Sequence, residues 1–302
     1  MGRILLYGRP VPGLMVIPAG AEQVSPLVPG STDLADLAEG EADGALILAP
    51  PGTLERDYVM AQALRTVRAQ GEIIVFAPKD KGGTRLRKTL EGFGCEVFEE
   101  ARRHHRFCQV ERPSTLDRLD LALRAGAPRR LDDTGLWTQP GVFSWDRLDR
   151  GTGLLLRTLP ELKGRGADFG AGIGLLALQV LKSAQVTELT LVELDRRAVR
   201  AAEHNLDDSR VEVIWGDVRQ LDERITGLDF IVMNPPFHDG GQEDRALGQA
   251  FIRTAAGRLR KGGVCWLTAN RHLPYESVLQ EHFRRVDLRA DDGGYKIYEA
   301  QA

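Results

Sequence analysis

Short apolar runs alternate with amphipathic segments throughout the second half of the chain. Each apolar run has the length of a strand, and each amphipathic segment has helical spacing. Strands that alternate with helices form parallel β-α-β units, so this half predicts an α/β fold with a doubly wound, mostly parallel sheet. The expected strands are 167–169, 189–193, 211–215, 230–233 and 264–269, and the expected helices are 172–183, 196–206 and 244–260. Two last runs, 285–290 and 295–300, flank two glycines and predict an antiparallel C-terminal hairpin.

The first half of the chain contains a weaker copy of the same pattern. Residues 43–51 parallel residues 229–236, and residues 71–77 parallel residues 263–269. A further strand-like run, 106–111, takes the place of the last strand of the second half. Because the order and the approximate spacing agree, we predict two α/β domains related by duplication.

The boundary between the two copies is marked by turn-forming residues. Glycine, proline and aspartate cluster between residues 126 and 141, which is typical of a linker. We therefore predict one domain over residues 1–130 and a second over residues 131–302. The first copy has no glycine-rich loop before its Asp43 strand, and Ala49 stands where the second copy has Asn234. We expect the first copy to keep the fold and to have lost the chemistry.

A glycine-rich loop follows the first strand of the second copy. Residues 168–174 read Asp-Phe-Gly-Ala-Gly-Ile-Gly, at the point where a strand turns into a helix. The carboxylate of Asp168 suits an ammonium group better than a pyrophosphate. Glu193 ends the next strand, where a carboxylate can accept both hydroxyls of a ribose. Asp217 ends the third strand, where its side chain could meet an adenine amino group. Together these positions favour S-adenosylmethionine over a nicotinamide dinucleotide.

The most specific motif is the tetrapeptide Asn-Pro-Pro-Phe at residues 234–237, directly after an apolar strand. Two prolines cannot continue a central strand, so the chain must leave the sheet at its carboxyl end, where open α/β sheets bind ligands. The Asn234 amide oxygen and the Pro235 carbonyl offer two acceptors to an exocyclic amine. Phe237 can stack on a planar base. We interpret Asn234, Pro235, Pro236 and Phe237 as catalytic residues.

The glycine loop, the two strand-end carboxylates and the tetrapeptide resemble those of class I S-adenosylmethionine-dependent amino methyltransferases. A narrower resemblance covers residues 140–300. There the chain is similar to the family of ribosomal RNA small-subunit methyltransferase C and its large-subunit relative, which are guanine-N2 methyltransferases. The segments that carry this likeness are 140–144, 148–149, 154–156, 238–240, 269–270, 273–275 and 295–298.

The resemblance implies a fold, a reaction and a set of site residues. The fold would be two tandem Rossmann-like class I methyltransferase domains, the first degenerate and serving substrate binding. The reaction would transfer a methyl group from S-adenosylmethionine to the N2 amine of a guanine in 16S ribosomal RNA. The cofactor would be held by Asp168, Gly170, Gly172, Gly174, Glu193, Asp217 and Phe143. The guanine would be held by Asn234, Pro235, Pro236 and Phe237, and His238 would be a structural or substrate-positioning residue.

Other substrates fit the same tetrapeptide. Guanine N2 in 23S ribosomal RNA, adenine N6 and the side-chain amide of a protein glutamine all present a planar nitrogen. A non-catalytic RNA-binding assembly factor on this fold is a further alternative, which the intact loop and Asn234 disfavour. A nicotinamide dehydrogenase would have no use for the Asn-Pro-Pro-Phe turn.

Charge and cysteine content limit the partners that the chain can have. The net charge is −3, yet residues 56–130 carry 16 basic and 10 acidic side chains. This segment is either a phosphate-binding surface or an arginine-rich solvated helix face, and the charge count alone favours the second. The three cysteines have neither disulfide nor zinc spacing, and no apolar run reaches the roughly 18 residues of a membrane helix. We expect a cytoplasmic monomer that needs no metal and acts on ribosomal RNA or the small subunit.

Overall fold

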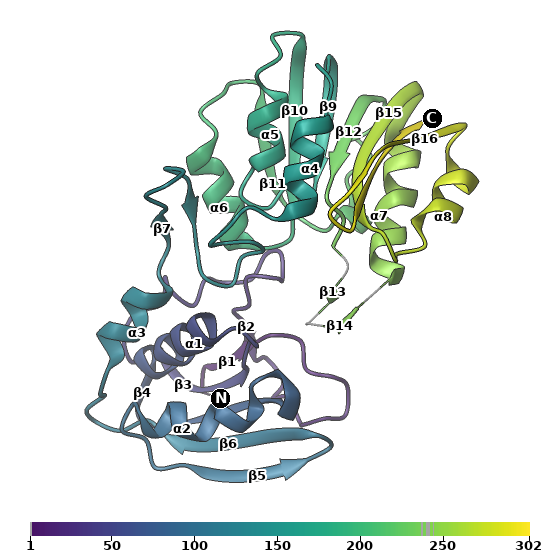
Figure 1. Cartoon of the computed structure of the whole chain (residues 1–302). Helices are drawn as coiled ribbons and strands as arrows, with labels where there is room; N and C mark the ends of the chain where they lie inside the picture. Colours follow the sequence, from purple (N-terminus) through teal and green to yellow (C-terminus); the bar gives the residue numbers. More distant parts are fainter. Residues whose placement is uncertain (1, 237, 240–241, 244) are drawn as a thin grey trace. The chain divides into compact units, whose positions relative to one another are not determined.

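The computed structural model describes residues 2–236, 238–239, 242–243 and 245–302. Contacts divide the chain into two units. The first runs up to Pro128 and includes residues 139–141, and the second comprises residues 129–138 and 142–302. Each unit is built around one mixed β-sheet (Figure 1).

The sheet of the second unit has the strand order β11-β10-β9-β12-β15-β17-β16. These strands are β9 (Gly164–Phe169), β10 (Val186–Glu193), β11 (Val211–Trp215), β12 (Leu228–Met233), β15 (Leu259–Asn270), β16 (Arg285–Asp292) and β17 (Tyr295–Gln301). The strands from β11 to β15 are parallel to their neighbours, and β17 and β16 are antiparallel. The predicted parallel sheet with an antiparallel C-terminal hairpin is confirmed. The helices of this unit are α4 (Arg150–Thr158), α5 (Leu175–Val180), α6 (Arg196–Asn205), α7 (Arg245–Arg258) and α8 (Tyr275–His282).

Strand β12 shows how this sheet is covered on both faces. Phe230 and Val232 are buried in a cluster with residues of α4, α5 and α6. Ile231 and Met233, which point to the opposite face, are buried in a cluster with residues of α7 and α8. A strand with both faces buried needs a continuous apolar sequence, and Leu228–Met233 is apolar at every position but Asp229. Figure 1 shows helices on both sides of the sheet.

Short elements complete the second unit. They are β7 (Arg129–Arg130), β8 (Trp137–Thr138), the 3₁₀ turn η3 (Val218–Gln220), β13 (His238–Asp239) and β14 (Gln242–Glu243).

The sheet of the first unit has the strand order β2-β1-β3-β4-β6-β5. Its strands are β1 (Ile4–Tyr7), β2 (Glu22–Gln23), β3 (Ala42–Leu48), β4 (Val67–Pro78), β5 (Phe98–Arg102) and β6 (His105–Glu111). Its helices are α1 (Thr53–Thr66), α2 (Leu86–Glu91) and α3 (Leu119–Gly126), with 3₁₀ turns η1 (Lys79–Lys81) and η2 (Gly83–Arg85).

The two sheets have the same topology. The order β2-β1-β3-β4-β6-β5 corresponds strand for strand to β10-β9-β12-β15-β17-β16, with the same parallel and antiparallel pairings. The second sheet adds only β11 at its edge. The first copy is reduced where the second has its glycine loop, because residues 8–21 form turns and bends without a helix. Two Rossmann-like sheets, the first of them reduced, are the predicted fold.

One helix differs from its prediction. The pattern predicts a helix over residues 172–183, but α5 spans only Leu175–Val180. Gly170, Gly172 and Gly174 have φ values of 72°, 55° and 89°, which lie in the left-handed region and cannot belong to a right-handed helix. The helix therefore begins only after the third glycine.

Among the described residues, no helix is long and apolar enough to cross a membrane. Cys95, Cys108 and Cys265 are buried free thiols.

Candidate active site

The predicted site residues lie at one edge of the second sheet. The pairing register aligns Asp168 in β9 with Leu191 in β10 and with Val232 in β12. Because these strands are parallel, their carboxyl ends meet at the same edge. Asp168, Glu193 and Asn234 are therefore brought to neighbouring strand ends.

The glycine loop is shaped by positive φ angles and by its bond to Glu193. The Gly172 N–H donates to Glu193 Oε2 at 2.8 Å, and the Gly170 N–H donates to the Val192 carbonyl at 2.8 Å. A Cβ added to Gly172 would meet no atom within 4 Å, so the backbone conformation rather than crowding requires glycine there. The loop leaves open space beside its backbone at Gly172.

Asp168 is a buried carboxylate without a proper partner. Its residue is 0% exposed, and neither oxygen has a hydrogen-bond partner among the described residues. Burial, and then the negative charge of Glu193, raise its pKa to about 8. The nearby Ala177 N–H opposes this rise but does not cancel it. A buried carboxylate in this state is costly unless a cation pairs with it. The position fits an ammonium group of a ligand.

Glu193 is half-buried and already engaged by the backbone. Its oxygens accept the N–H groups of Gly172 and, at 2.9 Å, of Asp195. Burial is the largest cause that raises its pKa, and the two N–H bonds oppose the rise. Each carboxylate oxygen can accept a second bond, so Glu193 can hold the loop and still receive ligand hydroxyls.

Asp217 has a local partner at the end of β11. Its carboxylate accepts the Arg219 N–H at 2.9 Å and forms an ion pair with the Arg219 guanidinium at 2.7 Å. It thereby caps the short 3₁₀ turn η3. The structure places Asp217 at the carboxyl end of β11, as predicted, but gives its carboxylate a local partner.

Asn234 is held by α4. Its Nδ2 donates to Asp149 Oδ2 at 3.1 Å and to Thr152 Oγ1 at 2.9 Å. Pro235 after it is buried and Pro236 is half-buried. The contacts with Asp149 and Thr152 were not found from the sequence, where Asp149 figures only as part of a resemblance. The remaining predicted catalytic residue, Phe237, lies outside the described residues, as do the side chains of residues 238–245.

The segment before α4 contacts the loop. Val142 is buried in a cluster with Ile173 of the glycine loop. Phe143, which follows it, is 58% exposed, so its ring is available to a ligand on this side of the unit.

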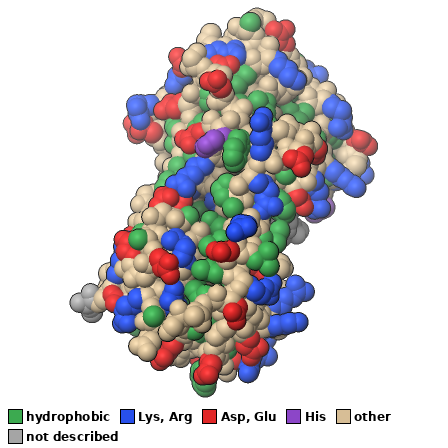
Figure 2. All heavy atoms as spheres, turned by 90° about the vertical axis from the view of Figure 1, so that its left-hand side faces the viewer, with side chains coloured by type: hydrophobic (Ala, Val, Ile, Leu, Met, Phe, Trp, Pro, Cys, Tyr) green, Lys and Arg blue, Asp and Glu red, His purple; other side chains and the backbone are tan. Residues whose placement is uncertain are grey.

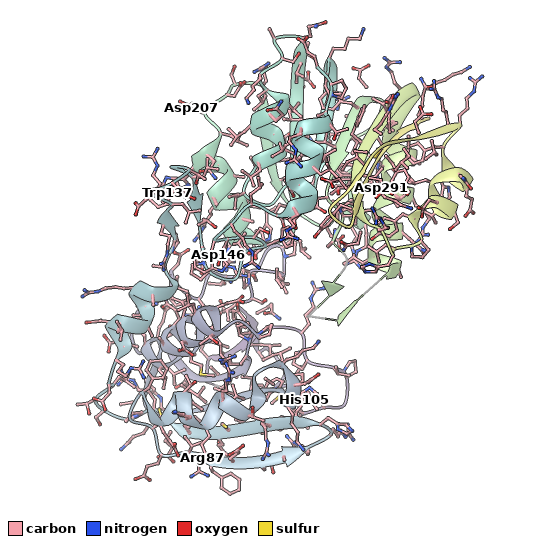
Figure 3. The ribbon with its side chains drawn as sticks, viewed as in Figure 1. Arg87, His105, Trp137, Asp146, Asp207 and Asp291 are labelled. Atoms are coloured by element: carbon pink, nitrogen blue, oxygen red, sulfur yellow. The ribbon has the colours of Figure 1, made fainter. Side chains whose placement is uncertain are left out.

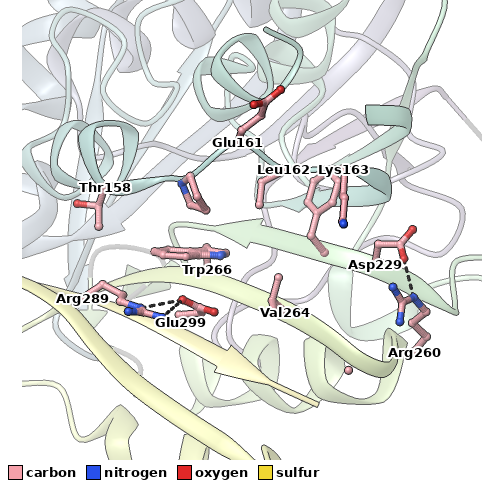
Figure 4. A pocket seen from close by; sticks show the side chains of 13 residues that line it. Thr158, Glu161, Leu162, Lys163, Asp229, Arg260, Val264, Trp266, Arg289 and Glu299 are labelled. Atoms are coloured by element: carbon pink, nitrogen blue, oxygen red, sulfur yellow. Dashed lines mark hydrogen bonds and ion pairs between the residues drawn. The ribbon is translucent and has the colours of Figure 1, made fainter. Parts of the chain in front are cut away.

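A cavity of about 690 Å³ elsewhere in the second unit is separate from this edge (Figure 4). It is lined by Asp229 at the start of β12, by Arg260, which pairs with Asp229, and by Trp266. Since Asp229 and Arg260 lie at the amino ends of their strands, the cavity lies away from Asp168 and Asn234. Among the described residues, no cluster of three or more His, Cys, Asp or Glu could hold a metal ion.

The fold and this strand-end site define a methyltransferase of the doubly wound class, and a family model described as methyltransferase small domain matches residues 133–299. Two curated relatives are named ribosomal RNA small subunit methyltransferase C. The one from Shewanella halifaxensis is 30% identical over 85% of this chain and 76% of its own length. The one from Pseudomonas paraeruginosa is 33% identical over 87% of this chain and 80% of its own length.

A solved structure agrees over both units. The T. thermophilus 16S rRNA guanine N2 methyltransferase, in complex with AdoMet and guanosine, is 26% identical, with a TM-score of 0.75 over 100% of this chain and 88% of the other. The chain belongs to the family of ribosomal RNA small subunit methyltransferase C. The resemblance predicted from the sequence is thereby confirmed. The roles of the individual site residues stay predictions.

Proposed function

We propose that this protein transfers a methyl group from S-adenosylmethionine to the exocyclic N2 amine of a guanine in 16S ribosomal RNA. The observation that carries the proposal is the pair of unlike groups at one sheet edge. Asp168 is a buried carboxylate that needs a cation, and Asn234 is an amide with both N–H groups engaged. Asp168 suits the ammonium group at the methionine end of the cofactor. Asn234, whose Oδ1 remains as a hydrogen-bond acceptor, suits the amine that receives the methyl group.

The residues present fit the cofactor. Asp168 would bind its ammonium group, Glu193 its ribose hydroxyls, and the loop of Gly170, Gly172 and Gly174, which is open at Gly172, would lie along it. Phe143 would cover it from the side of α4. When bound, S-adenosylmethionine supplies an electrophilic methyl group on a sulfonium.

The chain itself contributes positioning. Asn234 Oδ1 and the Pro235 carbonyl accept the two N–H groups of the amine, which fixes the base and directs the nitrogen lone pair. Acceptors that are already oriented cost no reorganisation during the reaction. Pro235 and Pro236 hold this turn rigid, and Phe237 is assigned to stacking on the base. Because the substrate is ribosomal RNA, we place the protein in the cytoplasm.

The product decides between the possible substrates. With labelled S-adenosylmethionine and unmodified ribosomal subunits, we expect label in the small-subunit RNA and N2-methylguanosine by mass spectrometry of its nucleosides. Label in large-subunit RNA, N6-methyladenosine, or label that resists ribonuclease would each contradict the proposed substrate. Cofactor binding without any transfer would favour the assembly-factor alternative.

We also infer that residues 1–130 form a degenerate methyltransferase-like domain that binds the RNA. A cavity of about 560 Å³ in this unit is lined by one carboxylate, Asp57, and by the cations Arg56, Arg85, Lys88 and Arg118. Arg56 is 1% exposed, and its Nε has no partner among the described residues. Such a cavity suits a backbone phosphate.

Positive charge is more evenly spread over one face of the surface. On the face shown in Figure 2, the Lys and Arg side chains that the structure describes are interspersed with Asp and Glu. We therefore assign the RNA contact to the cavity rather than to the total charge of the segment.

Two neighbouring residues of α2 test this assignment. Lys88 lines the cavity. Arg87, which is labelled in Figure 3, instead forms an ion pair with Glu91. Lys88→Glu should weaken RNA binding several-fold at low salt and reduce the salt slope by about one, because one phosphate contact is lost. Arg87→Glu makes the same change in net charge and should have a much smaller effect. Equal losses of affinity in the two variants would refute the cavity as the phosphate site.

A further inference from the structure

The two N–H groups of the Asn234 side chain are both directed at one helix end. One contacts Asp149 Oδ2 at 3.1 Å and the other contacts Thr152 Oγ1 at 2.9 Å. Asp149 is the N-cap of α4, and Thr152 lies in its first turn. We infer that Asp149 is a positioning residue for methyl transfer, which acts by fixing the orientation of the Asn234 amide. This inference rests on the function proposed above.

The physical reason is the near symmetry of an amide group. Asn has an oxygen and an NH₂ of almost equal size, so a half-turn about the last bond of the side chain exchanges an acceptor for two donors. An acceptor at this position binds an amine, whereas an NH₂ group would face the N–H groups of the amine. A carboxylate offers only acceptors. Asp149 can therefore bind Nδ2 of Asn234 but not its Oδ1, so the Oδ1 of Asn234 faces the substrate.

Asp149 is itself held in place. Its Oδ2 also accepts the Thr152 N–H at 2.8 Å, and its carbonyl accepts the Gly153 N–H at 2.8 Å. Burial, followed by the negative charge of Asp149, raises the pKa of the Tyr295 hydroxyl.

The first turn of α4 lies close against β17. A Cβ on Gly151 would be 2.7 Å from the Tyr295 ring, so only glycine allows the helix to approach this near. Asp149 is thus a fixed reference at which the substrate-binding amide is aligned, although it stands 85 residues earlier in the chain.

The inference predicts different effects for two substitutions of Asp149. Asp149→Ala removes the acceptor, leaves the amide free to turn, and should lower kcat by roughly 10- to 100-fold, a loss below that of removing a preorganised group outright. Asp149→Asn can present its own oxygen to both Thr152 N–H and Asn234 Nδ2, because a single oxygen accepts both bonds now. It should keep kcat within about threefold, since Asn caps a helix as well as Asp does. The cofactor dissociation constant should change little in either variant.

The helix cap must be separated from the positioning role. Asp222→Ala removes a comparable side-chain bond, to the Arg224 N–H, at a place without contact to Asn234. The Asp222→Ala protein should be less stable by the amount that the loss of such a bond costs, and its kcat should not change. The decisive comparison is Asp149→Ala in an Asn234→Ala background, where we expect less than a twofold further loss, because the group through which Asp149 acts is gone. A further loss of the full 10- to 100-fold would overturn the inference.

A second measurement does not depend on turnover. The side-chain NH₂ resonance of Asn234 is assigned by its loss in Asn234→Ala, and its hydrogen exchange is followed by NMR. We expect slow exchange in the native protein, since both N–H groups are bonded, and fast exchange in Asp149→Ala. Fast exchange in the native protein would refute the positioning role even if methyl transfer is found. Slow exchange in a protein without methyl transfer would leave the geometry correct and the proposed function wrong.

Discussion

Asn234→Ala should lower kcat for methyl transfer by roughly 10²- to 10³-fold, which is the usual loss when one preorganised polar group is removed from a reaction centre. Asn234 follows β12, and its Oδ1 is the acceptor left over once Asp149 and Thr152 have taken its N–H groups. Alanine leaves the amine of the substrate without this acceptor, so its lone pair is no longer directed. The measurement is single-turnover methyl transfer at saturating cofactor and RNA.

The same variant should bind cofactor within about twofold of the native protein, as measured by calorimetry. The reason is that the residues assigned to the cofactor, Asp168 and Glu193, belong to other strands. Thermal unfolding provides the control for folding, because the substitution leaves Asp149 and Thr152 without this partner. Undiminished turnover in a folded Asn234→Ala protein would refute the catalytic assignment.

The topology could be predicted because burial controls it directly. A strand must be apolar where both of its faces are covered, so β12 stands out by its Phe, Ile, Val and Met, and the buried second half of β15 by its Val, Cys, Trp and Leu. Parallel strands place their carboxyl ends at one edge of the sheet, so the sequence alone predicts that Asp168 and Asn234 lie close together. The duplication was visible for the same reason, since both sheets need the same apolar runs in the same order.

Side-chain partners could not be predicted, because they depend on contacts that no local pattern specifies. Asp217 stays a predicted cofactor residue, and the strand pattern gave no sign of its ion pair with Arg219 two residues later. The same pairing recurs elsewhere in the second unit. It is found at Asp195 with Arg197, Asp208 with Arg210, and Asp222 with Arg224. A recurring Asp-x-Arg spacing is a local signal that could have revealed this competition.

The partner of Asn234 gave no comparable signal. Asp149 caps a helix 85 residues earlier, and the packing of that helix against β15 and β17 brings it to the site. The length of α5 was also missed. There the glycines that make the loop suitable for a ligand also prevent the helix from starting where the apolar pattern begins.

Asp168→Asn should weaken cofactor binding on the order of 10²-fold while making the protein more stable. Loss of one member of a buried, hydrogen-bonded charge pair commonly costs a factor of this size in affinity. Without a bound cation, however, Asp168 is a fully buried carboxyl group with no partner among the described residues, beside the negative Glu193, and the folded protein has to keep it protonated. A neutral amide of the same shape removes that cost, so we expect an unfolding temperature higher by roughly a few degrees. Calorimetry and thermal unfolding measure the two effects.

The stability gained in Asp168→Asn should depend on pH in a defined direction. The folded-state pKa of Asp168 is about 8, against 3.8 for the ordinary carboxyl. Between these values the native protein holds a proton that the unfolded chain has lost, so native stability falls as pH rises through this window. In the variant, stability does not depend on pH in this way, because residue 168 no longer titrates. The difference in unfolding temperature should therefore be small near pH 4, grow up to about pH 8 and then level off.

Saturating S-adenosylmethionine should reduce the difference in unfolding temperature between Asp168→Asn and the unsubstituted protein. The reason is that the cation of the cofactor pairs with the carboxylate of Asp168 and not with the amide of the variant. The same titration thus tests the buried charge and its ligand together. A difference that does not change with pH would show that Asp168 is not a strained carboxylate. Equal stabilisation of both proteins by the cofactor would show that its ammonium group is bound elsewhere.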